Sequence, residues 1–176
     1  MDHFMEEIVI KKNRTLEDLL YVASAIAMVL MALFAVMTLQ VIFYQFDVLS
    51  LVLGLLCAGG AVLLYLRRDR LRTEYEYTFT NGEMDFAQVF NNQKRKNLGT
   101  MRVKNVEAFG PVTTPAFQRY ITMPGVKKEN WFLNRGAELY YFYFAKEGQK
   151  RMIIIEPSQE MVDMIKKYIP RGAYQA

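Results

Sequence analysis

An apolar block from Leu19 to Leu66 constrains this chain more than any other feature of its sequence. A helix over its first part, Leu19 to Tyr44, would reach about 39 Å at 1.5 Å per residue, and one over Val48 to Leu66 would reach about 28 Å. Because the hydrocarbon core of a bilayer is about 30 Å thick, both segments predict membrane-spanning helices. The short link between them, Gln45 to Asp47, predicts a tight helical hairpin.

A cleaved signal peptide is the alternative for the first segment. The apolar run is longer than the h-region of a signal peptide, five acidic residues precede it, and a second apolar segment follows. These features favour a retained helix. The alternative would remove the first span, so the two interpretations differ in the number of membrane crossings.

Lysine and arginine residues predict the orientation of the hairpin. Three basic residues precede the first segment, four follow the second, and the link contains none. Loops rich in Lys and Arg stay in the cytoplasm, so we expect both termini to be cytoplasmic. The residues expected to anchor the chain at the membrane boundary are Arg67, Arg68, Arg70 and Arg72.

The stretch EYEYTFTNGEMDF, residues 74 to 86, predicts a β-hairpin. Asn81-Gly82 suits a two-residue turn because both residues tolerate positive φ angles. With that turn, Phe79 pairs with Met84 and Tyr77 with Phe86 on one apolar face, while the other face is polar. This is typical of an antiparallel sheet with one face exposed to water.

The remaining sequence predicts further strands and one helix. Residues 94 to 109 alternate apolar and basic residues, and residues 138 to 157 form a second hairpin that turns near Glu147-Gly148. The arms of this hairpin are apolar on both faces, which indicates strands covered on both sides. We expect an amphipathic helix over residues 158–169, with Ser158 as its N-cap, to cover the second face.

This order of elements resembles bacterial pleckstrin-homology-like (PH-like) domains, in which a bent antiparallel sheet is closed by a C-terminal helix. Met101, Val106 and Phe109 occupy the apolar positions of an Ile-Pro-x-x-x-Ile-x-x-Val pattern, with Arg102 in place of the proline. The chain is also similar to two-span membrane proteins of Gram-positive bacteria. The resemblance implies an α+β membrane protein with a transmembrane helical hairpin and an antiparallel β-rich PH-like domain.

The expected boundaries follow from these segments. Residues 1–15 form a cytosolic N-terminal segment, 16–66 the transmembrane hairpin with spans over about 19–44 and 48–66, 67–72 a basic linker, and 73–176 the cytosolic domain. The bilayer is therefore the first partner, and the expected location is the bacterial cytoplasmic membrane.

Three groups of residues are candidate binding sites. The basic run Lys94, Arg95 and Lys96 suits an anionic lipid or a phosphorylated ligand, or is simply solvated. The irregular segment 111–136 carries Phe117, Tyr120 and Trp131, which either bind a partner or pack in the core. Small residues at Ser50, Gly54 and Ala58 allow close helix packing within the hairpin or in a homo-oligomer.

No catalytic site is expected. His3 is the only histidine and Cys57 the only cysteine, and the paired acids Glu74 and Glu76 are typical of a solvated sheet face. Phosphate-binding and dinucleotide motifs are missing from the sequence, as are metal-ligand motifs, so we expect no cofactor or metal site, and no nucleic-acid partner.

The favoured function is a non-enzymatic interaction or scaffold protein that binds a protein partner through its cytosolic domain. An anionic-lipid or phosphorylated-ligand sensor that uses residues 94–96 is the alternative. A two-span transporter is disfavoured because the spans hold no charged residue.

Overall fold

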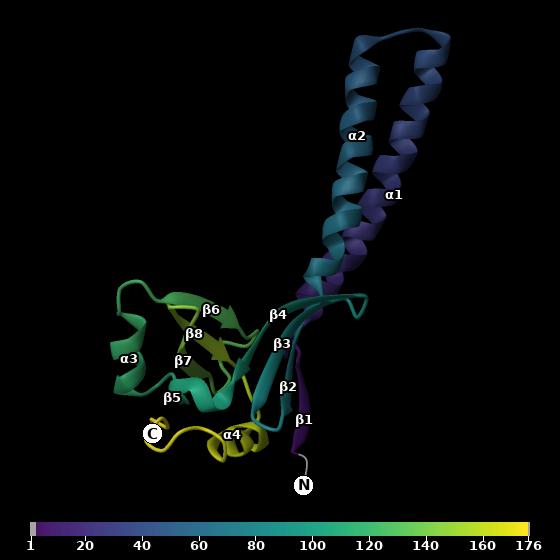
Figure 1. Cartoon of the computed structure of the whole chain (residues 1–176). Helices are drawn as coiled ribbons and strands as arrows, with labels where there is room; N and C mark the ends of the chain where they lie inside the picture. The colour runs from purple at the N-terminus through teal and green to yellow at the C-terminus, as the bar shows by residue number, and fades with distance from the viewer. Residues whose placement is uncertain (1–2, 176) are drawn as a thin grey trace. The chain divides into compact units, whose positions relative to one another are not determined.

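The computed structural model describes residues 3 to 175 and has an α+β fold (Figure 1). Its helices are α1 (Thr15–Tyr44), α2 (Val48–Arg67), α3 (Pro115–Ile121) and α4 (Gln159–Lys166), with 3-10 turns η1 (Arg68–Leu71) and η2 (Val103–Asn105). The strands are β1 (Phe4–Val9), β2 (Thr73–Thr80), β3 (Glu83–Phe90), β4 (Lys94–Arg102), β5 (Val106–Pro111), β6 (Lys127–Trp131), β7 (Tyr140–Lys146) and β8 (Gln149–Ile155).

Contacts divide the chain into two compact units. The helical unit comprises Asn13–Thr73 and Phe90–Gln93, and the β unit comprises Met1–Lys12, Glu74–Val89 and Lys94–Ala176. The second range of the helical unit is the turn between β3 and β4, which packs with the helices rather than with the strands it joins.

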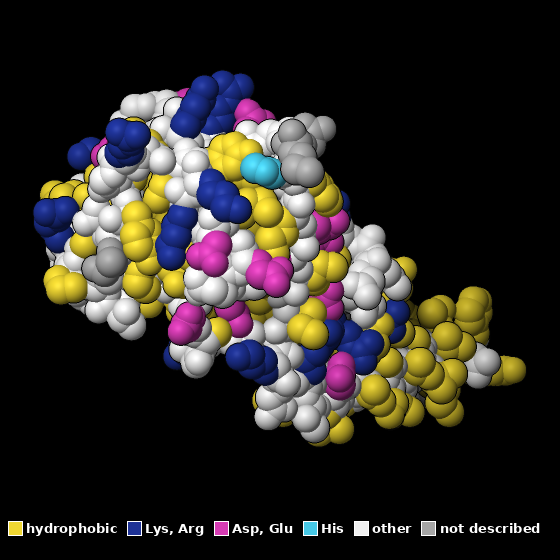
Figure 2. Space-filling model, turned by 90° about the horizontal axis from the view of Figure 1, so that it is seen from below, with side chains coloured by type: hydrophobic (Ala, Val, Ile, Leu, Met, Phe, Trp, Pro, Cys, Tyr) yellow, Lys and Arg dark blue, Asp and Glu magenta, His cyan; other side chains and the backbone are white. Residues whose placement is uncertain are grey.

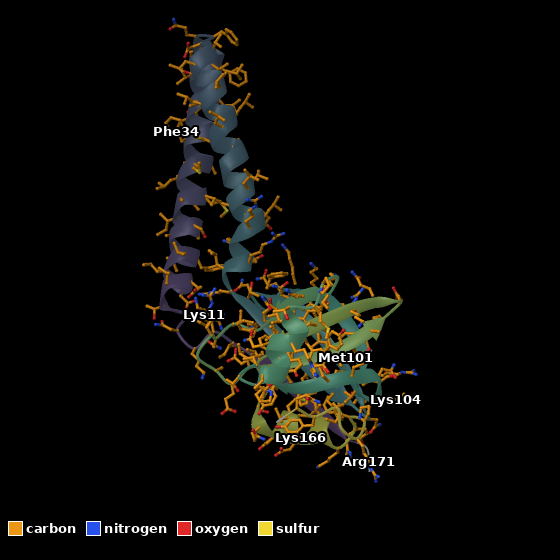
Figure 3. The ribbon with its side chains drawn as sticks, turned by 90° about the vertical axis from the view of Figure 1, so that its left-hand side faces the viewer. Lys11, Phe34, Met101, Lys104, Lys166 and Arg171 are labelled. Carbon is orange, nitrogen blue, oxygen red and sulfur yellow. The ribbon has the colours of Figure 1, made fainter. Side chains whose placement is uncertain are left out.

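The helical unit is an antiparallel hairpin of α1 and α2 (Figure 1). Both helices are long and apolar enough to cross a membrane, by length and composition. Their outer surfaces are almost wholly hydrophobic (Figure 2), and Phe34 is one of the side chains that point away from the pair (Figure 3). Asp47 caps α2 by accepting the backbone N–H of Ser50 at 2.8 Å.

The β unit contains two four-stranded sheets. The first has the order β1-β2-β3-β4, and the second has the order β5-β7-β8-β6, in which β6 runs parallel to β8. Strand β1 differs from the sequence prediction, which places residues 1–15 outside the domain. It pairs with β2 in antiparallel register, from Phe4 opposite Thr80 to Val9 opposite Tyr75. The helical hairpin is thus inserted between two neighbouring strands of one sheet.

The hairpin of β2 and β3 turns at Asn81-Gly82, where both residues have positive φ angles of 49° and 89°. Its apolar face is Tyr77, Phe79, Met84 and Phe86, each at most 1% exposed. The sequence prediction for this hairpin and its buried face is confirmed. These side chains face the second sheet in the main core.

Helix α4 closes the main core. Met161, Val162 and Ile165 are fully buried there, together with Phe142 and Ile153 of the second sheet. The prediction that this helix covers the second face of the β7-β8 hairpin is therefore wrong, because its apolar stripe packs on the inner face.

The second face is covered by α3 and the chain on either side of it. Phe117 of α3 packs against Tyr141 and Tyr143 of β7 and Ile154 of β8. The sequence of residues 111–126 does not predict this covering segment, because its composition is irregular and α3 is a single short helix that begins at Pro115.

The positions that carry the resemblance to PH-like domains are also in the core. Met101, Val106 and Phe109 are 6%, 2% and 0% exposed. Phe109 in addition pairs with the C-terminal tail, since its N–H donates to Ala173 O and its carbonyl accepts from Gln175 N, both at 2.8 Å. The tail thereby covers the edge of β5.

Candidate functional site

An Arg–Tyr cluster, formed by Tyr21, Tyr65, Arg68 and Arg72, lies at the end of the helical hairpin where α2 passes into η1. The Arg68 guanidinium carbon lies 5.5 Å from the centre of the Tyr21 ring and 5.7 Å from that of Tyr65. Arg72 lies over Tyr21 at 4.1 Å. Cations attract the faces of aromatic rings, so Arg68 links the two helices through their tyrosines.

Polar contacts fix this cluster to the turn between β3 and β4. Arg72 Nε donates to Asp18 Oδ1 at 2.8 Å, and Arg72 O accepts from Asn91 N at 2.7 Å. The Asn91 side chain donates to Tyr21 Oη at 3.2 Å and to the buried carboxylate of Asp69 at 3.4 Å. Asn91 has a φ of 50°, a conformation that asparagine tolerates better than most residues.

The four arginines predicted to anchor the chain therefore differ in their surroundings. Arg68 and Arg72 lie in the Arg–Tyr cluster, whereas Arg67 and Arg70 are exposed. The sequence interpretation missed Tyr21 and Tyr65, although tyrosines near the ends of apolar segments are typical of membrane interfaces.

A shallow lateral groove of about 420 Å³ runs between α1 and α2. Met28, Ala32 and Val36 contribute to one wall, and Ala61, Val62 and Tyr65 form the other. The groove is open here because the side chains of Ala32 and Ala61 are small. Its lining is apolar apart from the Tyr65 hydroxyl.

The basic run at the start of β4 is exposed. Arg95 forms an ion pair with Glu76 of β2 at 2.8 Å, across the polar outer face of the first sheet. Lys94 follows Gln93 directly, and Gln93 ends the turn that belongs to the helical unit. The run thus begins where the chain leaves the helical unit, with Lys94 and Lys96 on the side of β4 opposite to Arg95.

The aromatic residues of segment 111–136 are mostly in the core. Phe117 and Trp131 are both 8% exposed, and Tyr120 is half-buried against Tyr141 and Tyr143. Trp131 lies in the main core beside Phe86 at a ring-centre distance of 4.8 Å. Of the two roles considered for these side chains, the structure supports core packing.

The small residues of α2 are split between two faces. A Cβ placed on Gly54 would overlap Thr38 Oγ1 of α1, so this glycine permits the close approach of the helices. Ser50 is half-buried and donates its hydroxyl to Asp47, whereas Ala58 is exposed. A spacing of four advances by about 40° per step, and so Ala58 is turned by about 80° from Ser50 and leaves the interface.

A tip hollow of about 300 Å³ lies at the end of the β2-β3 hairpin, lined by Asn81, Gly82, Glu83, Arg102, Lys104 and Tyr168. Arg102 pairs with Glu83 at 2.7 Å, and Lys104 points outward (Figure 3). The sequence interpretation missed this site because Tyr168 comes from the C-terminal end of the chain.

His3 lies next to the tip hollow. Its Nδ1 shares a hydrogen bond of 2.6 Å with Tyr168 Oη, and its backbone exchanges two hydrogen bonds of 2.9 Å with Asn81. Figure 2 shows this histidine in cyan among hydrophobic side chains, with Lys and Arg side chains on the same face. These contacts give His3 a structural role in joining β1 to the hairpin tip.

Hydrogen bonds and burial shift the pKa of two groups. The backbone N–H and then the hydroxyl of Ser50 lower the pKa of Asp47, because both donate hydrogen bonds to its carboxylate. Burial raises the pKa of the Tyr77 phenol, which donates to Trp131 O in the core. Within residues 3 to 175, no group of three or more His, Cys, Asp or Glu side chains is placed to hold a metal ion.

Comparison with known families matches residues 1–175 to the family described as "Bacterial PH-like domain (DUF6106)". Comparisons with curated proteins and with solved structures find no match. The family match suggests a module that interacts with proteins or lipids, and it spans the apolar helices as well as both sheets. The chain therefore belongs to the bacterial PH-like domain family DUF6106.

Proposed function

We propose that this chain is an integral protein of the bacterial cytoplasmic membrane whose PH-like domain is a non-enzymatic module that binds a protein partner. The observation that carries the proposal is the insertion of the helical hairpin between β1 and β2. These strands pair side by side, with Val9 opposite Tyr75. A segment inserted at one place in a domain must leave and return on the same side of a membrane, as two spans do.

The charge distribution supports a cytosolic location for the domain and both termini. Lys11, Lys12 and Arg14 precede α1, four arginines follow α2, and the link of residues 45–47 contains no basic residue. The Arg–Tyr cluster adds the amphipathic side chains that favour the boundary between hydrocarbon and water.

The tip hollow is the surface that best fits a protein partner. Because Glu83 already pairs with Arg102, Lys104 carries the unbalanced charge, which favours an acidic peptide segment.

Photo-crosslinking in cells tests this proposal on the full-length chain. A photoreactive amino acid at the exposed Asn105, next to Lys104, should yield a protein adduct, and the peptide attached to it should be rich in Asp and Glu. Lys104→Gln should remove this adduct, and the same probe at Lys128, an exposed lysine on β6, is the control and should yield none. Equal adducts at both positions, none at Asn105, or an adduct that persists in Lys104→Gln would contradict the proposed partner surface.

A second candidate function is contact with anionic lipid through Lys94 and Lys96. It is favoured by one observation, that Lys94 follows directly on the turn held by the helical unit. If the helices span the membrane, this turn and the start of β4 are close to its surface, where each basic residue contributes about 1 kcal/mol of attraction to anionic lipid.

Fluorescence in nanodiscs tests the lipid candidate. A probe at the exposed Asn97 should report a less polar environment in phosphatidylglycerol than in phosphatidylcholine discs. The difference should vanish at 1 M salt, where the Debye length falls to about 3 Å, and on replacement of Lys94, Arg95 and Lys96 by glutamine. A signal independent of salt and of these residues would rule this candidate out.

A further inference from the structure

The lateral groove leads toward the Arg–Tyr cluster. Ala61 and Tyr65 of α2 and Arg68, the C-cap of this helix and first residue of η1, are spaced i, i+4 and i+7, and so they lie on one side of the helix end. Tyr21 and Met28 of α1 are likewise seven residues apart. Tyr65 both lines the groove and contacts the Arg68 guanidinium. The lateral groove therefore leads to the positively charged guanidinium of Arg68, within the helical unit.

Arg68 lacks a good anionic partner in the described part of the chain. Its Nε is buried and donates no hydrogen bond within residues 3 to 175, and the nearest carboxylate oxygen, Asp69 Oδ1, is 4.0 Å away. The side chain is still 25% exposed, which leaves it accessible from outside. Asp69 is meanwhile held by Asn91. An oxyanion ligand would supply the acceptor that the Arg68 Nε–H lacks within residues 3 to 175.

We propose that the lateral groove and Arg68 bind one acidic phospholipid, with an acyl chain along the groove and the phosphate at Arg68. This inference rests on the membrane insertion of α1 and α2 in the proposed function. From Met28 to Val36 the groove wall spans eight residues, or about 12 Å of helix. That length suits part of an acyl chain that runs into the bilayer. Basic pockets between membrane helices are known to favour anionic headgroups.

Charge favours a lipid over a second copy of the chain in this groove. A symmetric dimer would place the same patch of each copy against the other. Residues 67–72 hold four arginines and one aspartate, so such a contact would bring like charges together. An anionic headgroup instead complements this charge, while its chain fills the apolar part.

Native mass spectrometry of the full-length protein in mild detergent, with added phosphatidylglycerol or phosphatidylcholine, tests the headgroup part of the inference. We expect phosphatidylglycerol to bind at least about tenfold more tightly, because phosphatidylcholine carries the same phosphate but adds a choline cation that would lie beside Arg68. Arg68→Gln should abolish this preference. Arg70→Gln, which removes an exposed arginine of the same segment, should leave it unchanged.

Filling the groove tests the acyl-chain part. Ala32→Phe should weaken the binding of long-chain phosphatidylglycerol but leave a six-carbon-chain analogue unaffected. Ala23→Phe, at an exposed position of α1 outside the groove lining, should change neither. Equal affinity for the two headgroups, equal losses in Arg68→Gln and Arg70→Gln, or unchanged long-chain binding in Ala32→Phe would each overturn the inference.

Alkaline carbonate extraction of cell membranes separates the two possible failures. If the chain is washed out of the membranes, membrane insertion fails and the proposed function fails with it. If the chain stays in the membranes and shows no headgroup preference, only the lipid site is wrong.

Discussion

Asn134 links the chain just after β1 to the rest of the β unit through hydrogen bonds. Its side chain accepts from Lys12 N at 2.8 Å and donates to Ile10 O at 2.9 Å and to Glu156 Oε1 at 2.8 Å. Its own N–H donates to Glu156 Oε2 at 2.9 Å, and Glu156 is buried. A single pair of residues therefore holds the point at which the chain leaves the sheet for α1.

Asn134→Ala should destabilise the β unit by about 1–3 kcal/mol, because it removes one hydrogen bond to the buried Glu156 and two to the backbone just after β1. Asn130→Ala, an exposed position on β6, is the matched control and should change the stability by less than about 0.5 kcal/mol. Thermal unfolding of the full-length chain in detergent measures both. Equal effects of the two variants would contradict the role given to Asn134.

Gly82 is restricted both by its positive φ angle and by a close neighbour, whereas Gly148 is restricted by its φ angle alone. The φ of Gly82 is 89°, and an added Cβ would lie 2.8 Å from Tyr168 Cδ1. Gly148, at the turn of the β7-β8 hairpin, has a φ of 76° but no neighbour within 4 Å of such a Cβ. Gly148→Ala should therefore cost about 1–2 kcal/mol of backbone strain alone.

Gly82→Ala should cost more than Gly148→Ala, by about 1–3 kcal/mol, because the ring of Tyr168 must also move. The free energy of unfolding in denaturant measures the difference between the two variants. Equal or smaller destabilisation by Gly82→Ala than by Gly148→Ala would show that the Tyr168 ring does not pack against the hairpin tip.

Helices α1 and α2 meet along positions spaced alternately by three and four residues. On α2 the less exposed positions include Gly54, Cys57, Ala61 and Leu64, and Gly54 faces Thr38 of α1. This spacing keeps one face toward the partner helix, as in other antiparallel helix pairs.

Gly54→Leu should separate the two helices and lower the unfolding temperature of the hairpin in detergent, because its side chain would occupy the space of Thr38. Ala58→Leu places the same side chain on the exposed face and should have little effect. A larger loss in Ala58→Leu would instead indicate that the exposed face packs against another helix.

Strand β1 should be necessary for a stable β unit. It covers the edge of β2, buries Val9, and its Glu7 carboxylate accepts from Ser158 N at 2.8 and 3.0 Å, next to the start of α4. Residues 73–176 alone lose these contacts and expose an edge strand.

A soluble form should result when residues 3–12 are joined to 73–176 by a short flexible linker, since the ends of β1 and β2 are adjacent. We expect cooperative unfolding and a monomer for the linked form, and aggregation or a lower unfolding temperature for residues 73–176. Circular dichroism and sedimentation measure both properties. Identical stability of the two forms would show that β1 is dispensable.

The elements with a local signal were predictable, and those that depend on distant partners were not. Asn81-Gly82 and the alternation around it predict the β2-β3 hairpin with its buried face. Strand β1 has the mixed sequence FMEEIV, and its partner lies beyond both helices. Strand β6 reads KKENW, in which edge lysines mask the strand pattern.

The candidate sites also differ in whether a local sequence signal predicts them. The arginines near the end of α2 are evident from charge alone, because the positive-inside rule needs no tertiary contact. The lateral groove depends on how the two helices are rotated about their axes, and the tip hollow depends on Tyr168 meeting Gly82 across the chain. No local pattern encodes either arrangement.

At the scale of the whole molecule, the helical hairpin is inserted within a sheet, so its proposed membrane topology would determine whether the β unit can fold. Strand β1 is synthesised first, but its partner β2 follows only after both helices. If α1 and α2 span a membrane as proposed, the β unit can be completed only when the chain after α2 is on the same side of it as residues 3 to 12. A single crossing would leave β1 and β2 on opposite sides.

Cysteine accessibility in intact cells tests this central claim most directly. In a Cys57→Ala background, single cysteines are placed at Asn13, at Phe46 in the helical link, and at Gln118 on α3, all exposed positions. A membrane-impermeant maleimide should label residue 46 in intact cells, and residues 13 and 118 only after the membrane is opened. Labelling of residue 13 or residue 118 from outside, or protection of residue 46, would contradict the account.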